Sequence, residues 1–183
     1  MNNTAQEMYK TTKIAVPEDV KYAQEISDFI EKASKVEGTG IAKRTPEYIK
    51  EKILQGKAVI AFVNEKPVGF CYIETWQHDK FIANSGLVVD PEYRNAGLAK
   101  EIKKKAFELS LEKYPGAKIF GLTTSLAVMK INTELGYHPV TFSELTDDDK
   151  FWQGCTSCAY YDILVRTKRK NCLCSGMLYK PKV

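Results

Sequence analysis

A glycine and an arginine follow an apolar run in an arrangement suited to binding a pyrophosphate. Asp90-Pro91 ends the run, and Gly97 precedes a stretch whose apolar residues recur at helical spacing. The first turn of a helix has unpaired backbone N–H groups and the positive end of the helix dipole, so it favours an anion. Gly97 would let the main chain approach such a ligand closely, and Arg94 would add a charge or hold the loop shape. An ordinary strand-turn-helix fits these few residues equally well.

Four cysteines in the last third of the chain raise the question of a metal site. They are Cys155, Cys158, Cys172 and Cys174. Four thiolates are the ligand set of many structural zinc sites. The apolar run 159–166 is expected to be a strand, which would carry the chain about 25 Å from Cys158. We therefore expect buried or half-exposed thiols and no metal. With Cys71 the count is odd, which favours reduced thiols over a disulfide framework.

The spacing of apolar residues predicts the elements of the N-terminal half. Residues 1–12 are polar and predict a disordered tail. Helices are expected over residues 19–38 and, behind an N-cap at Thr45, over residues 46–54. Strands are expected at residues 14–16, 58–63, 68–73, 81–89 and 118–122, the second and third of which form a hairpin.

The C-terminal half continues with two helices and three strands. The helix after the glycine turn has an apolar face made of Leu98, Ile102, Ala106 and Leu109. Ser125 caps a shorter helix that ends at Gly136, just beyond its last turn. Strands are expected at residues 137–142, 159–166 and 172–179. Because helices precede and interrupt a run of strands, we expect one α/β (α+β) domain over residues 13–183. Its sheet should be mixed and mostly antiparallel.

The composition excludes several classes of protein. Of 183 residues, 44% are hydrophobic and 27% charged, as in soluble globular domains. No apolar run approaches the ~18 residues of a membrane span and no signal peptide is apparent, so we expect a cytoplasmic protein. The net charge of +4 suits an anionic ligand. The basic run at residues 103–105 precedes Glu108 and Glu112, which predicts a solvated helix face and no nucleic-acid site.

The glycine turn and its surroundings resemble the cofactor-binding signature of the GNAT acetyltransferases, Arg/Gln-x-x-Gly-x-Gly/Ala preceded by Leu-x-Val-x-Pro. The matching residues are Leu87, Val89, Pro91, Arg94, Gly97 and Ala99. Further on, residues 135–137 are similar to the family's Leu-Gly-Phe/Tyr, so the resemblance spans about residues 14–142. It implies the GNAT fold, with helices on both faces of the sheet. It also implies transfer of an acetyl or similar acyl group from acyl-CoA to a primary amine.

The same resemblance implies particular roles for the loop residues. The CoA-binding residues would be Val89, Arg94, Asn95, Ala96, Gly97, Leu98 and Ala99. In such proteins a bulge near the end of the strand separates it from its neighbour and admits the pantetheine arm. The N–H of Val88 or Val89 would then meet the thioester carbonyl, as an oxyanion-type contact.

Two further stretches resemble the acetyltransferase domain of N-acetylglutamate synthases. Residues 40–47 are similar to that group's Arg-Ser-x-Glu segment, and residues 118–124 to its strand ending Leu-Thr-Thr. This resemblance implies a free amino acid as acceptor, glutamate first, and a place in arginine biosynthesis. Arg44 would bind the carboxylate through its planar fork, although a solvated or capping residue before a helix fits equally well. The sequence departs from the group at Ser125, where a second carboxylate-binding arginine is missing.

Acyl transfer to an amine needs a base for the ammonium proton and an acid for the leaving thiolate. Many GNAT enzymes use as the acid a tyrosine four residues before the Leu-Gly-Phe glycine, and here that position is Asn132. Asn132 would donate a hydrogen bond to the thiolate, or be a partly exposed helix residue. For the base, Glu74 is favoured, because Tyr72, Trp76 and His78 alternate onto the same strand face. Desolvation among aromatic rings makes a carboxylate a better base, though Glu74 also fits a solvent-facing residue.

Other functions fit the same features. GNAT enzymes also acylate polyamines, aminoglycosides and protein N-termini, and a non-catalytic acyl-CoA-binding module would equally lack the tyrosine. An acidic pocket would favour a polycationic acceptor, whereas a pocket centred on Arg44 would favour an amino acid. We expect a small-molecule amine as partner, with no nucleic acid and no membrane, and a homodimer is left open.

Overall fold

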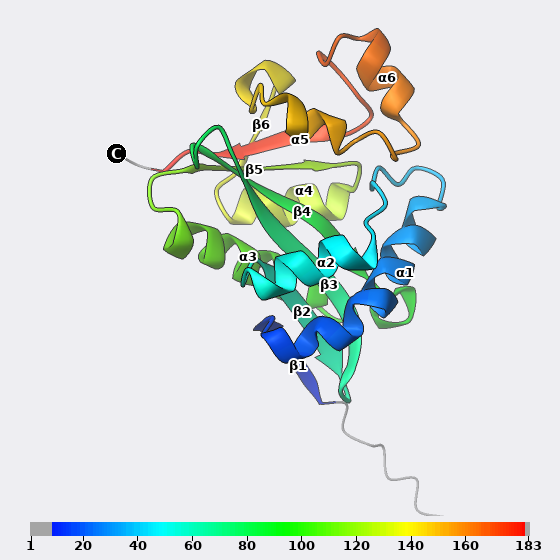
Figure 1. Ribbon diagram of the computed structural model, residues 1–183. Helices are drawn as coiled ribbons and strands as arrows, with labels where there is room; N and C mark the ends of the chain where they lie inside the picture. Colours follow the sequence, from blue (N-terminus) through cyan, green and yellow to red (C-terminus); the bar gives the residue numbers. More distant parts are fainter. Residues whose placement is uncertain (1–8, 182–183) are drawn as a thin grey trace, which may run out of the picture.

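The computed structural model describes residues 9–181, in which one seven-stranded sheet carries helices on both faces (Figure 1). The strand order is β1-β2-β3-β4-β5-β7-β6, and only β4 and β5 are parallel neighbours. The strands are β1 (Lys10–Ile14), β2 (Ala58–Val63), β3 (Lys66–Trp76), β4 (Phe81–Val89), β5 (Lys118–Thr123), β6 (His138–Val140) and β7 (Ser175–Tyr179). The expected α/β fold class, with a mixed and mostly antiparallel sheet, is confirmed.

Two helices cover one face of the sheet, in front in Figure 1. They are α1 (Ala23–Ser34), which follows the 3₁₀ helix η1 (Pro17–Tyr22), and α2 (Pro46–Leu54). The expected start of α2 is confirmed, because the Thr45 side chain accepts a hydrogen bond from the Tyr48 N–H at 3.2 Å. Both helices bury isoleucines against β2 and β3, and these are Ile26, Ile30, Ile49 and Ile53.

The opposite face carries α3 (Leu98–Lys113), which follows the 3₁₀ helix η2 (Pro91–Tyr93), and α4 (Leu126–Glu134). The apolar face expected for α3 is confirmed, since Leu98, Ile102, Ala106 and Leu109 are buried in one cluster with residues of β2 and β3. Ser125 caps α4 by accepting from the Val128 N–H. None of the helices in the described part of the chain is long and apolar enough to cross a membrane.

Residues 149–174, which we call the C-terminal segment, fold differently from the prediction. The 3₁₀ helix η3 (Phe142–Glu144) leads to α5 (Asp149–Gln153) and α6 (Tyr161–Arg166). The strand expected at residues 159–166 is wrong: this run begins in a turn and then forms α6. Leu164 is buried, at 3% exposure, whereas its apolar neighbour Val165 is exposed. A short apolar run fits helix and strand alike, so its packing decides.

The N-terminal strand begins earlier than expected. Residues 10–12 were assigned to a disordered tail, but they belong to β1 and pair with residues 61–63 of β2. Thr11 and Thr12 are β-branched residues that suit an edge strand without being apolar. The proposed boundary at residues 12 and 13 therefore falls inside β1, and the rest of the expected tail, residues 1–8, lies outside the described residues.

The sheet opens between β4 and β5. These strands pair only from Phe81 to Ala83, although both run further. Beyond this point β4 contains a bulge. Ser85 and Val88, three residues apart on β4, pair with Tyr72 and Phe70, which are only two residues apart on β3. Gly86 lies in the bulge with φ of 67°, where an added Cβ would come within 2.7 Å of the Tyr72 ring. The bulge implied by the family resemblance is therefore present, and it leaves a gap in the sheet.

Candidate active site

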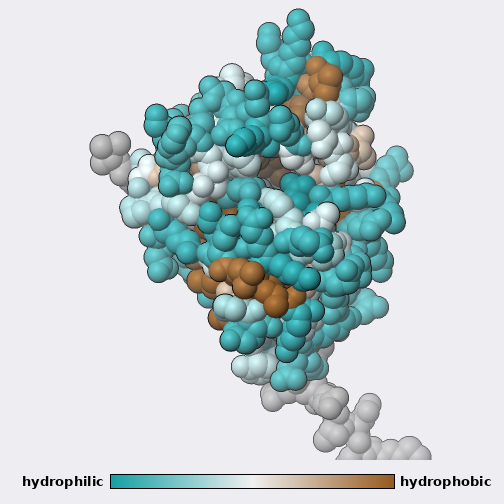
Figure 2. All heavy atoms as spheres, in the orientation of Figure 1, coloured by the Kyte–Doolittle hydropathy of each residue, from teal (hydrophilic) through white to brown (hydrophobic). Residues whose placement is uncertain are grey.

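Two cavities lie on opposite sides of this gap. The α3-side cavity, of about 590 Å³, lies at the start of α3 and beside α4. The α2-side cavity, of about 410 Å³, lies between α2 and the C-terminal segment, where the surface in Figure 2 is hollowed below that segment. The residues that line both are Gly40, Ile41, Asn84, Gly86, Gly121 and Leu122. These shared residues lie where the two cavities adjoin, at the gap between β4 and β5, and we call this place the passage.

The glycine turn presents backbone donors to the α3-side cavity. Asn95 and Gly97 both have left-handed backbones, with φ of 62° and 81°. Within residues 9–181, no hydrogen-bond acceptor is present for the amide groups of residues 95–97. A Cβ added at Gly97 would meet nothing within 4 Å, so the space before α3 is open. Arg94 Nε donates to the Val89 oxygen at 3.3 Å and fixes the loop. This arrangement suits a pyrophosphate.

Most residues proposed to bind CoA line this cavity. They are Val89, Arg94, Asn95, Gly97, Leu98 and Ala99, together with Val88 and Asn132 from the proposed catalytic set. Ala96 does not line it and instead packs against the core. Asn132 is 1% exposed and therefore not the partly exposed helix residue that was considered. Its side-chain oxygen has no hydrogen-bond partner in the described part of the chain, which leaves an acceptor unsatisfied beside the cavity.

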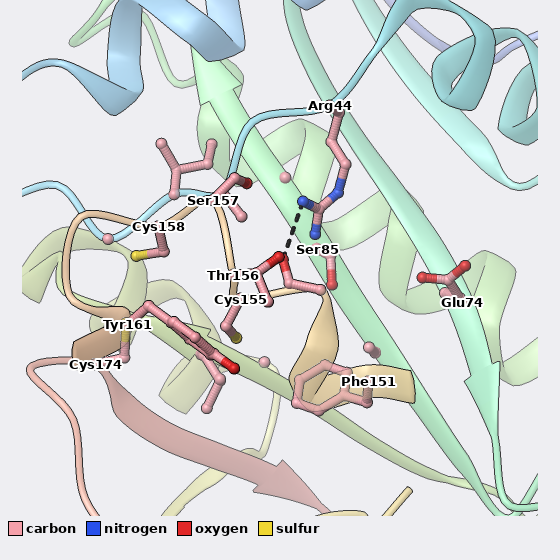
Figure 3. Close-up of a pocket in the computed structure, with 18 of the residues that line it drawn as sticks. Arg44, Glu74, Ser85, Phe151, Cys155, Thr156, Ser157, Cys158, Tyr161 and Cys174 are labelled. Atoms are coloured by element: carbon pink, nitrogen blue, oxygen red, sulfur yellow. Dashed lines mark hydrogen bonds between the residues drawn. The ribbon is translucent and has the colours of Figure 1, made fainter. Parts of the chain in front are cut away.

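Arg44 lies half-buried in the wall of the α2-side cavity (Figure 3). Its Nε donates to the Tyr72 hydroxyl at 2.8 Å. Its Nη1 donates to the main-chain oxygens of Lys43, at 2.8 Å, and Gly154, at 3.3 Å. Nη2 forms no hydrogen bond with any of the described residues. The alternative of a solvated residue before a helix is therefore wrong, and one nitrogen of a fixed guanidinium remains for a ligand.

Glu74, on β3, lines the same cavity, and Figure 3 shows it separated from Arg44. Lys52 Nζ lies 2.5 Å from Glu74 Oε1, and the Tyr48 hydroxyl donates to Oε2 at 2.6 Å. Glu74 was expected among aromatic side chains, and the structure adds the ammonium of Lys52 to these surroundings. His78, which continues the alternation of the strand residues but was expected to be a surface residue of the turn at the strand end, lies in the exposed turn after β3.

The tyrosines around Arg44 are neutral hydrogen-bonding groups. Burial raises the pKa of Tyr48 and of Tyr72 above the ordinary value, and Glu74 raises both further. Burial also works to lower the pKa of Arg44, but Tyr72, Tyr48 and Glu74 favour its charge, and the net pKa is raised. The cavity therefore holds a permanent cation beside two protonated phenols.

The four clustered cysteines, Cys155, Cys158, Cys172 and Cys174, all line the α2-side cavity. The strand that was expected to separate the two cysteine pairs is absent from this part of the described chain, because α6 takes its place and both pairs line one cavity. Burial raises the pKa of Cys155 to about 11 and that of Cys174 to about 12, with neighbouring thiols adding to both. Within residues 9–181, no group of three or more His, Cys, Asp or Glu is arranged to hold a metal ion.

Sequence reasoning missed the C-terminal segment as a wall of this cavity. Hydrogen bonds join the segment to residues 38–44, with the Gly38 N–H donating to the Tyr160 hydroxyl at 2.8 Å. Ser157 Oγ donates to the Lys43 oxygen at 3.5 Å. Sequence reasoning also missed Lys52, although Tyr48 and Lys52 are four residues apart on α2 and so lie on one helix face.

Comparison with family models gives one match, and comparison with curated protein sequences gives none. The model described as the acetyltransferase (GNAT) family matches residues 27–133. No curated protein sequence matches the chain significantly.

Several solved structures share the fold. N-acetylglutamate synthase from Neisseria gonorrhoeae, complexed with coenzyme A and N-acetyl-glutamate, is similar with a TM-score of 0.68 and 15% identity, over 98% of this chain. The chain spans only 37% of that synthase. Rv2747 from Mycobacterium tuberculosis, in complex with CoA and NLQ, has a TM-score of 0.67 and 13% identity, over 94% of this chain and 99% of its own. The putative acetyltransferase yncA from Salmonella typhimurium, with acetyl-CoA, has a TM-score of 0.65 and 11% identity, over 96% and 95%.

At these identities the structural likeness shows the fold, while the family model addresses the sequence itself. That model covers more than half of the chain, from α1 to the end of α4. The cavity beside α3 has the open backbone donors that the CoA pyrophosphate requires. The protein therefore belongs to the GNAT acetyltransferase family and is an acyltransferase that uses acyl-CoA as its co-substrate.

Proposed function

We propose that this acyltransferase acylates the primary amine of a small carboxylate-bearing molecule, with an amino acid such as glutamate as the leading candidate. The observation that carries the proposal is the charge of the α2-side cavity. Its cationic lining residues are Lys43, Arg44 and Lys150, whereas Glu74 is the one acid among the described residues that line it. Glu74 is itself paired with Lys52. Such a cavity attracts a carboxylate and offers little to a polycation.

Arg44 is the proposed carboxylate-binding residue. Its bonds to Tyr72 and to two main-chain oxygens hold the guanidinium in one orientation, and Nη2 is left to donate. A guanidinium held in advance loses little entropy when a carboxylate binds to it. Ser125, where the N-acetylglutamate synthases have a second arginine, caps α4 in this chain. The proposal therefore rests on one arginine, and glutamate must be compared with other amino acids.

Glu74 is the proposed base, acting directly or through water. It would take the proton that the amine nitrogen loses as that nitrogen attacks the thioester carbonyl carbon. Lys52 and Tyr48 hold both carboxylate oxygens, which fixes the group in place. The N–H of Val88 or Val89, just after the bulge in β4, would stabilise the oxyanion.

The surroundings of the reaction are part of the same proposal. The five cysteines are free thiols, which suits the reducing cytoplasm. Small-molecule amines remain the proposed partners, nucleic acids and membranes are not, and a homodimer is left open.

The acceptor is tested by measuring thiol release from acetyl-CoA with a panel of amines. The panel contains glutamate, aspartate, glutamine, neutral amino acids, spermidine and an aminoglycoside. We expect turnover with one or more of the amino acids and poor turnover of the polycations. Efficient acylation of spermidine or the aminoglycoside, with no amino acid used, contradicts the proposal. Tight CoA binding without turnover of any amine would favour the non-catalytic module.

Arg44→Ala sharpens the same test. Loss of a partly buried, charge-assisted contact costs about 2–3 kcal/mol, so the acceptor KM should rise roughly 30- to 150-fold. The CoA KM should barely change, because Arg44 lies outside the glycine turn. Lys50→Ala, at an exposed position of α2, is the control and should leave both constants unchanged. An unchanged acceptor KM in Arg44→Ala would remove Arg44 from the acceptor site.

A further inference from the structure

Lys103 is a buried cation that has no partner of opposite charge. It is 2% exposed and lies on α3, with its Nζ beside Gly121 of β5. In the part of the chain that the structure describes, its ammonium forms no salt bridge and no hydrogen bond, and it lies 5.3 Å from the centroid of the Tyr137 ring. The sequence placed Lys103 on a solvated helix face, and that prediction is wrong. Burying a lone ammonium is costly, so the position calls for an explanation.

The ammonium lies at the passage between the two cavities. Lys103 lines the α3-side cavity. A Cβ built on Gly121 would lie 3.6 Å from Lys103 Nζ and 3.3 Å from the main-chain oxygen of Asn84. Gly121 and Asn84 both line the passage. In the proposed function the thioester enters from the α3 side and the amine from the α2 side, which places Lys103 Nζ close to the reacting atoms.

The usual acid of this reaction has no equivalent on α4. Many GNAT enzymes have a tyrosine where this chain has Asn132, and a side-chain amide does not give up a proton at neutral pH. Asn132 lines the same cavity with its buried Oδ1 unsatisfied, so it can accept a hydrogen bond from a bound ligand. A group that can release a proton is therefore needed from another element.

We propose that Lys103 is the general acid that protonates the departing CoA thiolate. The nucleophile forms a bond to the thioester carbonyl carbon, and the tetrahedral intermediate then breaks its C–S bond. The electron pair of that bond goes to sulfur, which takes a proton from the Lys103 ammonium and leaves as the CoA thiol. Lys103 becomes a neutral amine and regains a proton from solvent, which receives the proton lost by the nucleophile.

The groups that face Lys103 leave it as the one that titrates near neutrality. They are Cys71 from β3 and Tyr137 after α4, while β4 and β5 contribute the neutral Asn84 and Gly121. Burial raises the pKa of Cys71 to about 11 and that of Tyr137 well above its ordinary value. Burial lowers the pKa of Lys103 to about 8. An acid of about that pKa is matched to a thiol, whose ordinary value is about 8.5.

The direction of the pH dependence follows from this value. The acid works in its protonated form, so thiol release should be fastest below about pH 8 and fall as pH rises through the pKa of Lys103. The role does not depend on which amine is the acceptor, because C–S bond cleavage is common to every acceptor and to water.

The experiment compares Lys103→Met with Lys104→Met, the same substitution at the exposed neighbouring position. Thiol release from acetyl-CoA is followed with glutamate and also without an amine, when water is the nucleophile. We expect Lys103→Met to lower kcat in both reactions by about 100-fold and to lose the decline near pH 8. CoA affinity, measured by calorimetry, should stay within about threefold. Lys104→Met should behave as wild type.

Two further results keep the proposal open to refutation. Lys103→Arg retains the cation but holds its proton too tightly to act as an acid, so it should remain as slow as Lys103→Met. Full activity in Lys103→Arg would mean that charge alone matters and would overturn the assignment. If the variants fail to fold, the wild-type profile decides, because kcat that stays constant from pH 7 to 9 also overturns it. A failed amine panel with intact acetyl-CoA hydrolysis would count against the proposed acceptor and leave Lys103 in place.

Discussion

The two cavities are built from the chain in different ways. The α3-side cavity takes most of its lining from one continuous strand-turn-helix, residues 86–103, and from α4 with the strand before it. The α2-side cavity collects residues 40–48, 72–86 and 150–174, which are far apart in the sequence. The part of the proposed cofactor side that the glycine turn forms therefore depends on local backbone geometry, which a motif specifies, although residues 33 and 36–41 also line this cavity. The acceptor side depends on packing between distant segments, which no single motif records.

The largest expected effect on this comparison is that of Glu74→Gln. The variant keeps the size of the side chain but removes the proposed base, so kcat should fall roughly 100-fold. CoA affinity should be unchanged, because Glu74 belongs to the α2-side cavity alone. Steady-state kinetics and calorimetry make the measurement.

The control for this variant is Glu47→Gln, an exposed carboxylate on α2. Lys52 loses its ionic partner in Glu74→Gln, so a thermal melt must first show that the variant is folded. Wild-type turnover with a wild-type pH profile would remove Glu74 from the role of base.

A smaller effect, on the other cavity, is expected for Gly97→Val. The left-handed φ of 81° disfavours a β-branched residue by about 1–2 kcal/mol. CoA affinity should weaken roughly 5- to 30-fold as the loop shifts, while the acceptor KM stays constant. Gly116→Val is a matched control, since Gly116 has φ of 84°, an equally open surrounding and no place in either cavity. Equal CoA affinities for wild type and Gly97→Val would contradict the phosphate-loop assignment.

The smallest effect is expected from removing metal. We predict no stoichiometric zinc, because burial keeps Cys155 and Cys174 protonated and a metal would have to displace those protons. Elemental analysis of protein never exposed to a chelator makes the measurement, and chelator treatment should leave turnover unchanged. About one zinc per chain, lost together with activity, would show that the thiols are ligands and not only lining.

The difference between local geometry and packing of distant segments also explains which features the sequence predicted. Thr45 and Ser125 were predicted as helix caps because a cap requires a particular side chain beside the first turn. Gly97 was predicted because a glycine between a strand and a helix lets the backbone approach a ligand closely, and the structure gives it a left-handed φ of 81°. These are local requirements, and β4 matched its expected bounds for the same reason.

The errors concern residues whose environment is set by distant parts of the chain. Lys103 lies on the same face of α3 as Ala106 and Ser110, three and seven residues further on, and both of these are buried. The run of three lysines at residues 103–105 concealed this helical spacing. The run Tyr161–Arg166 became α6 because it packs over β5 and β7 with Trp152, where no strand partner is available. The Glu74–Lys52 pair joins β3 to α2, so no spacing within either element revealed it.

The position of β7 has a consequence for synthesis on the ribosome. β7 lies between β5 and β6, so strand β6, of three residues, has no neighbour in the sheet until residues 175–179 have been made. Strands β1 to β5 and helices α1 to α4 precede it and can pack while the chain is still growing. The half of the molecule that contains the glycine turn can thus form first. The α2-side cavity, proposed to hold the amine, can be completed only after β6 and β7 have anchored the C-terminal segment on both sides.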